Sequence, residues 1–342
     1  MKTSNTEKNR VPCQPVSRLS RCGQSRSPAQ RQHCLDMAGG WLQHRCVVRA
    51  IADALHAGTS MRETILRRTG LVSPLLEAKH PDAPSVFQPE ALLREARRQK
   101  NLGSDAVPAI CLLDPDGDIL RHLHLRGAAR RHKDWACYHT DLFVFGQAGF
   151  EVGIVACVVG APFAVLVAEQ LFASGCALLV SITSAGQIVA HGPTPYFVLI
   201  NRALRDEGTS HHYLPASAFA CAPDPALLDA VAAALLALPK HPAVHRGATW
   251  TTDAPYRETE AAIAKAHDLG ILAVEMEAAA LYAFAIARKR DVVCFAHVTN
   301  AMAQSEGDFE KGEADGATAS LHVLAATAKA WRELRGGFSA PR

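Results

Sequence analysis

The sequence lacks a long apolar run. No stretch of its 342 residues reaches the roughly 18 consecutive apolar residues that a membrane-spanning helix needs. The basic residues near the N-terminus are not followed by an apolar stretch of signal-peptide length. These two absences argue against a membrane partner and against secretion, and we expect a cytoplasmic protein.

Cysteine pairs with metal-site spacing are also missing. The chain has 10 cysteines, but no two are separated by two residues, and several lie in apolar runs, as Cys157 and Cys294 do. This distribution argues against a zinc site and against a disulfide framework, and it favours buried thiols in a reducing cytosol. We therefore expect no metal. Aromatic residues are scarce, at 6% of a chain that is 49% hydrophobic and 20% charged, which is a globular composition.

Charge is distributed unevenly along the chain. Residues 1–84 hold thirteen Lys and Arg against six Asp and Glu, whereas the remainder holds twenty-three against twenty-seven. The first 36 residues are rich in Ser, Arg, Gln and Lys and have almost no apolar periodicity. We predict that residues 1–84 form a poorly specified, largely disordered basic extension. The mild acidity of the rest argues against nucleic acid as its partner, so a nucleic-acid face would lie in the extension.

From Pro89 onward the pattern alternates between helices and strands. Residues 89–103 are typical of a helix with Pro in its first turn, and residues 106–114 of a short apolar strand. Apolar strands at 151–160 and 176–183 flank a helix that Gly175 ends, which makes a βαβ unit. Because these strands are continuously apolar, they predict a parallel sheet that is covered on both faces.

The C-terminal half continues this alternation. We predict strands at 195–204, 244–252 and 291–299 and helices at 224–238, 257–270 and 316–334. The predicted fold is α/β: a single domain over residues 85–336 with a mostly parallel central sheet flanked by helices. Ligands in such folds gather at the carboxyl ends of the strands, so the candidate site lies after Gly160, Thr183, Thr252 and Thr299.

The strongest candidate for chemistry is the segment Val274–Leu281, with the sequence VEMEAAAL. We predict a helix that is apolar on every side from Ala273 to Ala287, apart from Glu275 and Glu277 near its start. Such a helix is normally buried, and a buried carboxylate without a partner is costly. The two glutamates therefore either complement the helix dipole from its first turn or bind a ligand.

This segment resembles the E-M-E signature of uridine phosphorylases and hexameric purine nucleoside phosphorylases, and the resemblance covers about the last two-thirds of the chain. It implies that Glu277 accepts hydrogen bonds from the 2′- and 3′-hydroxyls of ribose. It also implies that Met276 lies against the sugar and that Glu275 supports its neighbour. A carboxylate suits this role because its two oxygens can accept from two adjacent hydroxyls.

Two further segments are similar to motifs of the same family. Residues 205–215 (RDEGTSHHYLP) resemble R-x-D-G-A-S-x-H-F-x-P, and residues 181–188 (SITSAGQI) resemble the phosphate-binding R-x-G-T-x-G-x-I. The second resemblance implies that Ser184, together with the loop at Gly160, holds phosphate. The family's arginine position is Ser181, however, and its G-D-P-x-R loop is represented only by Leu113–Gly117, which lacks the Gly and the Arg. We consider three sources for the missing positive charge: Arg121, Arg126 and Arg257.

The resemblance also implies contacts to the base. Residues 253–258 (DAPYRE) are similar to a D-x-F-Y segment that packs on the base, which makes Tyr256 the expected stacking residue and Arg257 a polar contact. Asn300 follows the last apolar strand, near the place where hexameric purine enzymes have an Asp that protonates the base. Since an Asn donates a hydrogen bond without giving up a proton, it stabilises the departing base less than an acid would.

We therefore expect a nucleoside phosphorylase, a pentosyltransferase that converts a purine or pyrimidine nucleoside and phosphate into the free base and (deoxy)ribose 1-phosphate. Glu277 and Asn300 are the expected catalytic residues, and phosphate is a co-substrate with no other cofactor. The resemblance implies a homo-oligomer. Three alternatives stay open: a nucleosidase that uses water, a nucleoside-binding protein without turnover, and nucleic-acid binding by the basic extension.

Overall fold

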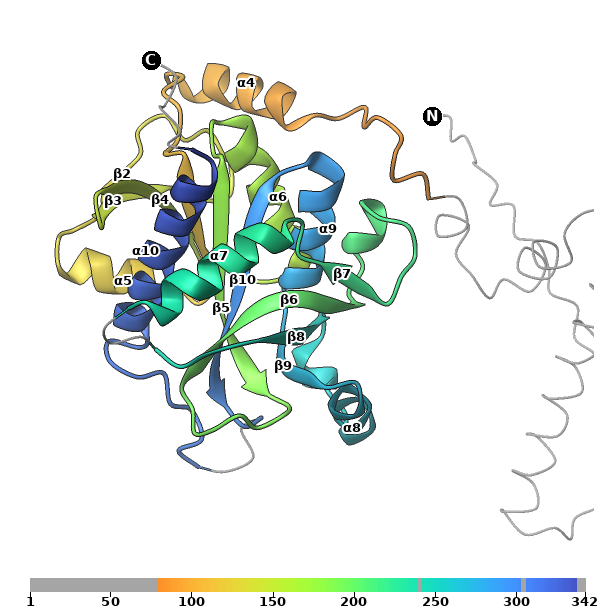
Figure 1. Ribbon diagram of the computed structural model, residues 1–342. Helices are drawn as coiled ribbons and strands as arrows, with labels where there is room; N and C mark the ends of the chain where they lie inside the picture. Colours follow the sequence, from red (N-terminus) through yellow and green to blue (C-terminus); the bar gives the residue numbers. More distant parts are fainter. Residues whose placement is uncertain (1–78, 239–241, 303–305, 337–342) are drawn as a thin grey trace, which may run out of the picture. The chain divides into compact units, whose positions relative to one another are not determined.

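A ten-stranded sheet runs through the computed structural model, which describes residues 79–238, 242–302 and 306–336 (Figure 1). Most of the predicted extension, residues 1–78, lies outside the described residues. The chain from residue 79 onward forms one compact unit. Its strands are β1 (Ile110–Asp114), β2 (Arg130–Arg131), β3 (Phe143–Gln147), β4 (Phe150–Ala156), β5 (Leu178–Gln187), β6 (Tyr196–Asp206), β7 (Phe219–Cys221), β8 (Val244–Thr252), β9 (Ile271–Glu275) and β10 (Asp291–Asn300).

The middle of the sheet is parallel and much of the rest is antiparallel. β4, β1, β5 and β10 lie side by side in that order and run parallel, and β8 runs parallel to β6 and β9. Antiparallel pairings join β2 to β3, β3 to β4, β5 to β9, β6 to β7 and β6 to β10. Half of these ten pairings are antiparallel, so the sheet is mixed. The predicted parallel strands at its centre are confirmed, and the two longest pairings, β5 with β10 and β6 with β8, are parallel, but more antiparallel pairing surrounds them than the sequence indicated.

The hairpin of β3 and β4 shows one physical reason for this difference. Its two connecting residues, Ala148 and Gly149, both have positive φ, at 48° and 80°. Two such residues make the tight turn whose twist matches antiparallel strands. Ala in the first position is a weak signal for that turn, and β3 was therefore not predicted from the sequence.

Five strands form a closed ring of pairings. β5 pairs with both β9 and β10, and the path from β10 through β6 and β8 returns to β9. β5 is therefore shared between this ring and the parallel strands β1 and β4. The end of β5 consequently faces residues from both halves of the sheet.

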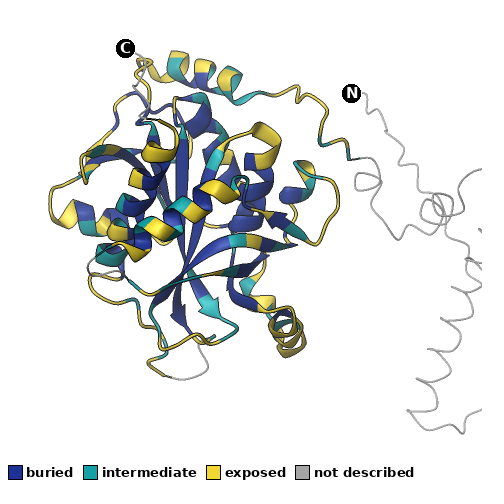
Figure 2. Ribbon diagram, in the orientation of Figure 1, coloured by how far each residue is buried: buried dark blue, intermediate teal, exposed yellow. Residues whose placement is uncertain are grey.

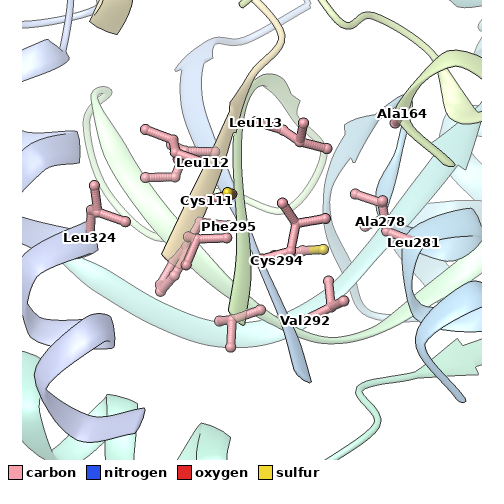
Figure 3. Packing of buried hydrophobic residues seen from close by; sticks show 14 of the residues in the cluster. Cys111, Leu112, Leu113, Ala164, Ala278, Leu281, Val292, Cys294, Phe295 and Leu324 are labelled. Atoms are coloured by element: carbon pink, nitrogen blue, oxygen red, sulfur yellow. The ribbon is translucent and has the colours of Figure 1, made fainter. Parts of the chain in front are cut away.

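Helices cover both faces of the sheet. α10 packs against α5 and α7, whereas α6 packs against α4 and α9. Figure 3 shows Leu324 of α10 on one side of β1 and β10, with Ala164 of α6 and Leu281 of α9 on the other. This confirms an α/β fold in which helices flank the sheet. The helices are α4 (Pro89–Lys100), α5 (Asp118–Leu125), α6 (Ala161–Ala173), α7 (Pro225–Leu236), α8 (Glu260–Asp268), α9 (Ala278–Arg288) and α10 (Ala317–Leu334), with 3-10 turns η1 (Ser210–His212) and η2 (Pro255–Arg257).

The strands between the helices are largely buried (Figure 2), and hydrophobic side chains form the core there. Leu112 and Leu113 of β1 and Phe295 of β10 have no exposed surface. Burial of a side chain of this size contributes roughly 1.5–3 kcal/mol relative to exposure. The apolar runs that predict the strands are thus the buried segments of the sheet, and the end of each run marks the edge at which its strand ends. Within the described part of the chain, no helix combines the length and the apolar character needed to cross a membrane.

Several predicted ends are confirmed. α7 follows Asp224, whose carboxylate accepts hydrogen bonds from the N–H groups of Ala226 and Leu227 as an N-cap does. β8 spans the predicted residues 244–252, and α8 is followed by Gly270 with a φ of 68°. The helix α5 was not predicted.

The predicted helix from Ala273 to Ala287 is wrong in its first part. Residues 271–275 form β9, which pairs with β8 and with the end of β5, and the helix α9 begins only at Ala278. Ile271–Val274 is an aliphatic run that fits a strand as well as a helix, and pairing with strands distant in sequence decides between them. Glu275 is therefore the last strand residue, and Glu277 precedes the first turn of α9.

Candidate active site

Four parallel strands end at one edge of the sheet. The pairing of β1 with β4 sets Asp114 beside Ala156, and the pairing of β5 with β10 sets Ser184 beside His297. The residues that follow these strands therefore meet at the same edge. This is the edge at which ligands bind in α/β sheets.

β9 brings a fifth segment to this edge of the sheet. Because it runs antiparallel to β5, with Val274 beside Gly186, the residues after Val274 are directed back along β5 toward Thr183. Met276 is half-buried there and Glu277 is 1% exposed. The two halves of the sheet thus place the E-M-E segment next to the end of β5.

Glu277 has one satisfied oxygen and one without a partner. Its Oε1 accepts a hydrogen bond of 2.7 Å from the backbone N–H of Gly160, which precedes α6. Its Oε2 is buried and has no hydrogen-bond partner among the described residues. The Thr183 hydroxyl is close enough to lower the pKa of Glu277, but it donates at 3.4 Å to the Ser184 carbonyl. An oxygen in this state is available to a hydroxyl of a ligand.

The electrostatics of Glu277 reflect its burial. Burial first, and then the charge of the neighbouring Glu275 carboxylate, raise the pKa of its carboxyl from 4.5 to about 8, against the hydrogen bond from Gly160. The carboxyl is thus held close to neutral pH, where small changes in its surroundings change its charge. Perturbed carboxyls of this kind are typical of functional sites.

Glu275 has a different role. It accepts hydrogen bonds from the hydroxyls of Thr249 and Thr251, at 3.0 and 2.5 Å, and from the N–H groups of Glu277 and Ala278, at 2.8 and 2.7 Å. Both of its oxygens are used by the protein. Glu275 therefore complements the N-terminal end of α9 and fixes the backbone at Glu277. Its part in binding a sugar stays a prediction.

The expected phosphate position is occupied by a carboxylate of the protein. The backbone N–H of Ser184 donates a hydrogen bond of 2.7 Å to Oδ2 of Asp116, in the loop after β1. Ser181, at the family's arginine position, is buried, and its hydroxyl has no partner among the described residues. The structure therefore brings Ser184 together with an acid rather than with an arginine.

More acids surround this loop. Asp114 is 1% exposed and accepts from the N–H of Leu120, and burial raises its pKa to about 7. Asp118 forms ion pairs with Arg121 at 2.7 Å and with Lys311 at 2.5 Å. Arg121 also contacts the carboxylate of Asp315 at 3.4 Å. Of the three arginines considered as substitutes, Arg121 is thus committed to acids, and both Arg126 and Arg257 are exposed.

His297 belongs to the core as well as to this edge. It is 5% exposed and its ring stacks on Phe197 with 4.5 Å between centroids. Burial lowers its pKa to about 4. The ring is therefore neutral at pH 7, which agrees with a buried histidine that does not carry charge.

Asn300 lies buried at the end of β10. Its Oδ1 accepts from the N–H of Met302 at 3.0 Å, and its Nδ2 donates to the Thr299 hydroxyl at 3.2 Å. The carbonyl end of the amide is thus engaged by the backbone. The second hydrogen of Nδ2 is the group that Asn300 can offer to a ligand.

Two of the predicted base-contacting residues, Tyr256 and Arg257, are exposed, unlike Asn300. Tyr256 and Arg257 belong to η2, after β8, and the Tyr256 side chain is 99% exposed. Their contacts with a base stay a prediction. The motif at residues 205–215 is held together by Arg205, which donates to Ser210, Pro215 and Ser217. That motif is a scaffold for η1.

Sequence reasoning missed Asp116 as a site residue. The loop Leu113–Gly117 was treated only as a phosphate loop without its Gly and Arg. The available signal was the acid itself, because a carboxylate in a phosphate loop reverses the charge that the ligand meets. Among the described residues, no group of three or more His, Cys, Asp or Glu is arranged to hold a metal ion.

Comparison with known proteins agrees with this architecture. In solved structures, the chain is similar to uridine phosphorylase from Vibrio fischeri ES114, with a TM-score of 0.57 and 20% identity, over 67% of this chain and 95% of that one. It is also similar to that enzyme complexed with 6-hydroxy-1-naphthoic acid, with a TM-score of 0.56 and 18% identity, over 70% and 98% of the two chains. At these identities the likeness shows the fold. No curated protein matches.

The family comparison covers the site itself. A model of the phosphorylase superfamily matches residues 117–329, which is more than half of the chain. The matched range includes the Gly160 turn, Ser184, Glu277 and Asn300, and it begins one residue after Asp116. From the match and the shared fold together, we conclude that this chain belongs to the phosphorylase superfamily.

Proposed function

We propose that this protein cleaves the N-glycosidic bond of a purine or pyrimidine nucleoside. The observation that carries the proposal is the buried Glu277, whose Oε1 is fixed by Gly160 and whose Oε2 has no partner among the described residues. A buried acceptor in this state is costly unless a ligand donor completes it. The 2′- and 3′-hydroxyls of a ribose are such donors, and Met276 supplies an apolar surface beside them.

The bond breaks as positive charge develops on the sugar. The transition state resembles an oxocarbenium ion, and the Glu277 carboxylate beside the hydroxyls stabilises that charge once it is ionised. Glu275 keeps Glu277 in place through the four hydrogen bonds that it accepts at the start of α9. Neither residue needs to form a covalent bond with the sugar.

The departing base accumulates negative charge and needs a donor. We assign this role to Asn300, because Met302 fixes its carbonyl oxygen and leaves an N–H of Nδ2 for an acceptor atom of the base. Purine N7 and a pyrimidine carbonyl are both acceptors, so this contact suits either class. In this proposal Tyr256 and Arg257 also contact the base, and this requires η2 to move toward it.

Two acceptors for the sugar are considered. Phosphate held by Ser184 and Gly160 would give (deoxy)ribose 1-phosphate, as in the nucleoside phosphorylases that the sequence resembles. Water would give the free sugar. The second candidate is favoured by Asp116, because its carboxylate occupies the Ser184 N–H and repels a phosphate dianion. A homo-oligomer in the cytoplasm, without a cofactor, stays the expected setting.

The test is a product analysis on the full-length protein. Uridine, thymidine, inosine and adenosine are incubated with the protein, with and without phosphate, and bases, free sugars and sugar phosphates are separated by chromatography. Release of a base supports the proposal. Tight binding of a nucleoside with no release of base from any of the four would refute it in favour of a binding protein.

A Glu277→Ala variant tests the residue that carries the proposal. It removes both oxygens and should lose most of the activity. An Asp315→Asn variant is the matched control, since it removes a carboxylate that is exposed and paired with Arg121. Unchanged turnover in Glu277→Ala contradicts the proposed sugar contact.

A further inference from the structure

Asp116 takes the place of a bound anion at the end of β5. Its Oδ2 lies 2.7 Å from the backbone nitrogen of Ser184, with the N–H directed at the carboxylate. A backbone N–H at the end of a buried strand is a donor that an anionic ligand would otherwise use. In this protein the anion belongs to the chain itself.

The register of the sheet places this carboxylate near the E-M-E segment, because Asp116 is held at Ser184 and β9 directs the residues after Val274 back along β5 toward Thr183. Burial is the main cause that raises the pKa of Glu277, and the charge of Asp116 adds a small contribution in the same direction. Glu277 is 1% exposed, and its Oε2 is buried and lacks a partner among the described residues. Asp116, in contrast, is exposed. Glu277 is thus the buried acid, which contacts the sugar in the proposed function. Asp116 is the exposed acid, which water can reach beside Ser184.

The charges around Asp116 oppose binding of a phosphate dianion. The nearby acids are Asp114, Asp118 and Glu277, and the nearby cations Arg121 and Lys311 both form ion pairs with Asp118. His297 is neutral at pH 7. To bind at the Ser184 N–H, phosphate would have to displace Asp116, whereas water can bind beside Asp116 without displacing it.

We propose that Asp116 is a catalytic base that selects water as the acceptor of the sugar. This inference rests on the proposed cleavage of a nucleoside. The water oxygen forms a bond to C1′ of the sugar while the bond from C1′ to the base nitrogen breaks, and its electron pair leaves with the base. The proton lost by the water passes to the Asp116 carboxylate, and the base takes up a proton from solvent. The products are the free sugar and the free base.

Ser184 positions the Asp116 carboxylate, the proposed catalytic base. Its N–H holds Oδ2 and thereby fixes the direction of the carboxylate, while the other oxygen is the one that accepts the proton of the water. The backbone donor cannot be removed by a substitution at Ser184, so the test is made on Asp116.

The experiment compares Asp116→Asn and Asp315→Asn with the unchanged protein, with uridine and inosine as probes. Base release is measured in phosphate-free buffer and with phosphate added, and the sugar product is identified by chromatography. We expect free sugar at a rate independent of phosphate, and a fall in kcat of roughly 100-fold or more in Asp116→Asn, because general-base catalysis contributes about that factor. KM and the thermal midpoint should change little, and Asp315→Asn should keep its activity.

Each outcome separates this inference from the proposed function. Base release that requires phosphate and yields a sugar 1-phosphate overturns the inference and leaves the proposed cleavage intact. Phosphate-independent release of the nucleobase that Asp116→Asn does not slow also overturns the inference, because another group then deprotonates the water. No base release from either probe or from the wider set of nucleosides refutes the proposed function, and the inference fails with it.

Discussion

The backbone N–H of Gly160 donates to Oε1 of Glu277 over 2.7 Å and so ties the start of α6 to the start of α9. Gly160 has a φ of 90° and a ψ of 147°, a conformation that residues with a Cβ rarely adopt. A Cβ at this position would meet no atom within 4 Å. The glycine is therefore required for its backbone conformation rather than for space.

Gly160→Ala is expected to weaken nucleoside binding. An alanine would strain the backbone at this position, and relief of that strain would move the N–H away from Glu277. Oε1 of Glu277 would then no longer be held in place. We expect KM for the nucleoside to rise about tenfold, corresponding to the roughly 1.4 kcal/mol of one weakened hydrogen bond to a charged group. Steady-state kinetics measure the change. Gly127→Ala is the control, since Gly127 also has a positive φ, of 61°, and open space around it; an equal loss there would show that strain alone is responsible.

Nucleoside affinity is expected to rise with pH. Since the pKa of Glu277 is about 8, its carboxyl is mostly protonated at pH 7 in the free protein. Two ribose hydroxyls can donate to its oxygens only when it is ionised, so binding must release a proton below pH 8. The dissociation constant should fall by up to roughly tenfold per pH unit as pH rises toward 8 and level off above it. Calorimetric titration at several pH values measures this.

The variant Glu277→Gln separates this effect from other titrating groups. Asp114, with a pKa of about 7, also changes its charge in the same range. In Glu277→Gln the affinity should be lower and nearly independent of pH. A slope that persists in the variant would assign the pH dependence to Asp114 or to another group.

Long apolar runs made much of the fold predictable. β8 and β10 were found at nearly their observed bounds, and Asp224 marked the start of α7, because continuous aliphatic residues and a capping carboxylate are local signals. The bounds failed at Ile271–Val274, where the same aliphatic residues fit a strand or a helix. Pairing with β8 and β5 resolves that choice, and it depends on segments far away in the sequence.

The positions of the candidate site residues were predictable where a motif marks them and hidden where the chain departs from the motif. Glu277 and Asn300 lie at the predicted edge of the sheet, while Tyr256 is exposed on η2. Asp116 was passed over because its partner, the N–H of Ser184, lies 68 residues further along the chain. Only the fold brings these two groups together, so the residue types alone could not show that the anion position is filled.

Glu275→Ala is expected to destabilise the protein strongly. It would leave the hydroxyls of Thr249 and Thr251 and the N–H groups of Glu277 and Ala278 without their acceptor in a buried place. We expect the free energy of unfolding to fall by about 3 kcal/mol, since each buried donor without a partner costs on the order of 1 kcal/mol or more. Urea denaturation measures it. Glu260→Ala, at the exposed first turn of α8, should change stability by less than about 0.5 kcal/mol.

Glu277→Gln should stabilise the protein without ligand, and increasingly so as pH rises. The pKa of Glu277 is raised from 4.5 to about 8 on folding, so the fold favours the protonated form. The stability that this form contributes is fully present below pH 4.5 and is lost as pH rises through about 8, because the unfolded chain ionises freely over that window. Glutamine keeps the shape and carries no charge. We expect the two proteins to be similar near pH 5 and the variant to be more stable at pH 8.5, by on the order of 2 kcal/mol. Thermal denaturation across this range provides the comparison, and a variant that is less stable at pH 8.5 would mean that Glu277 has a structural partner after all.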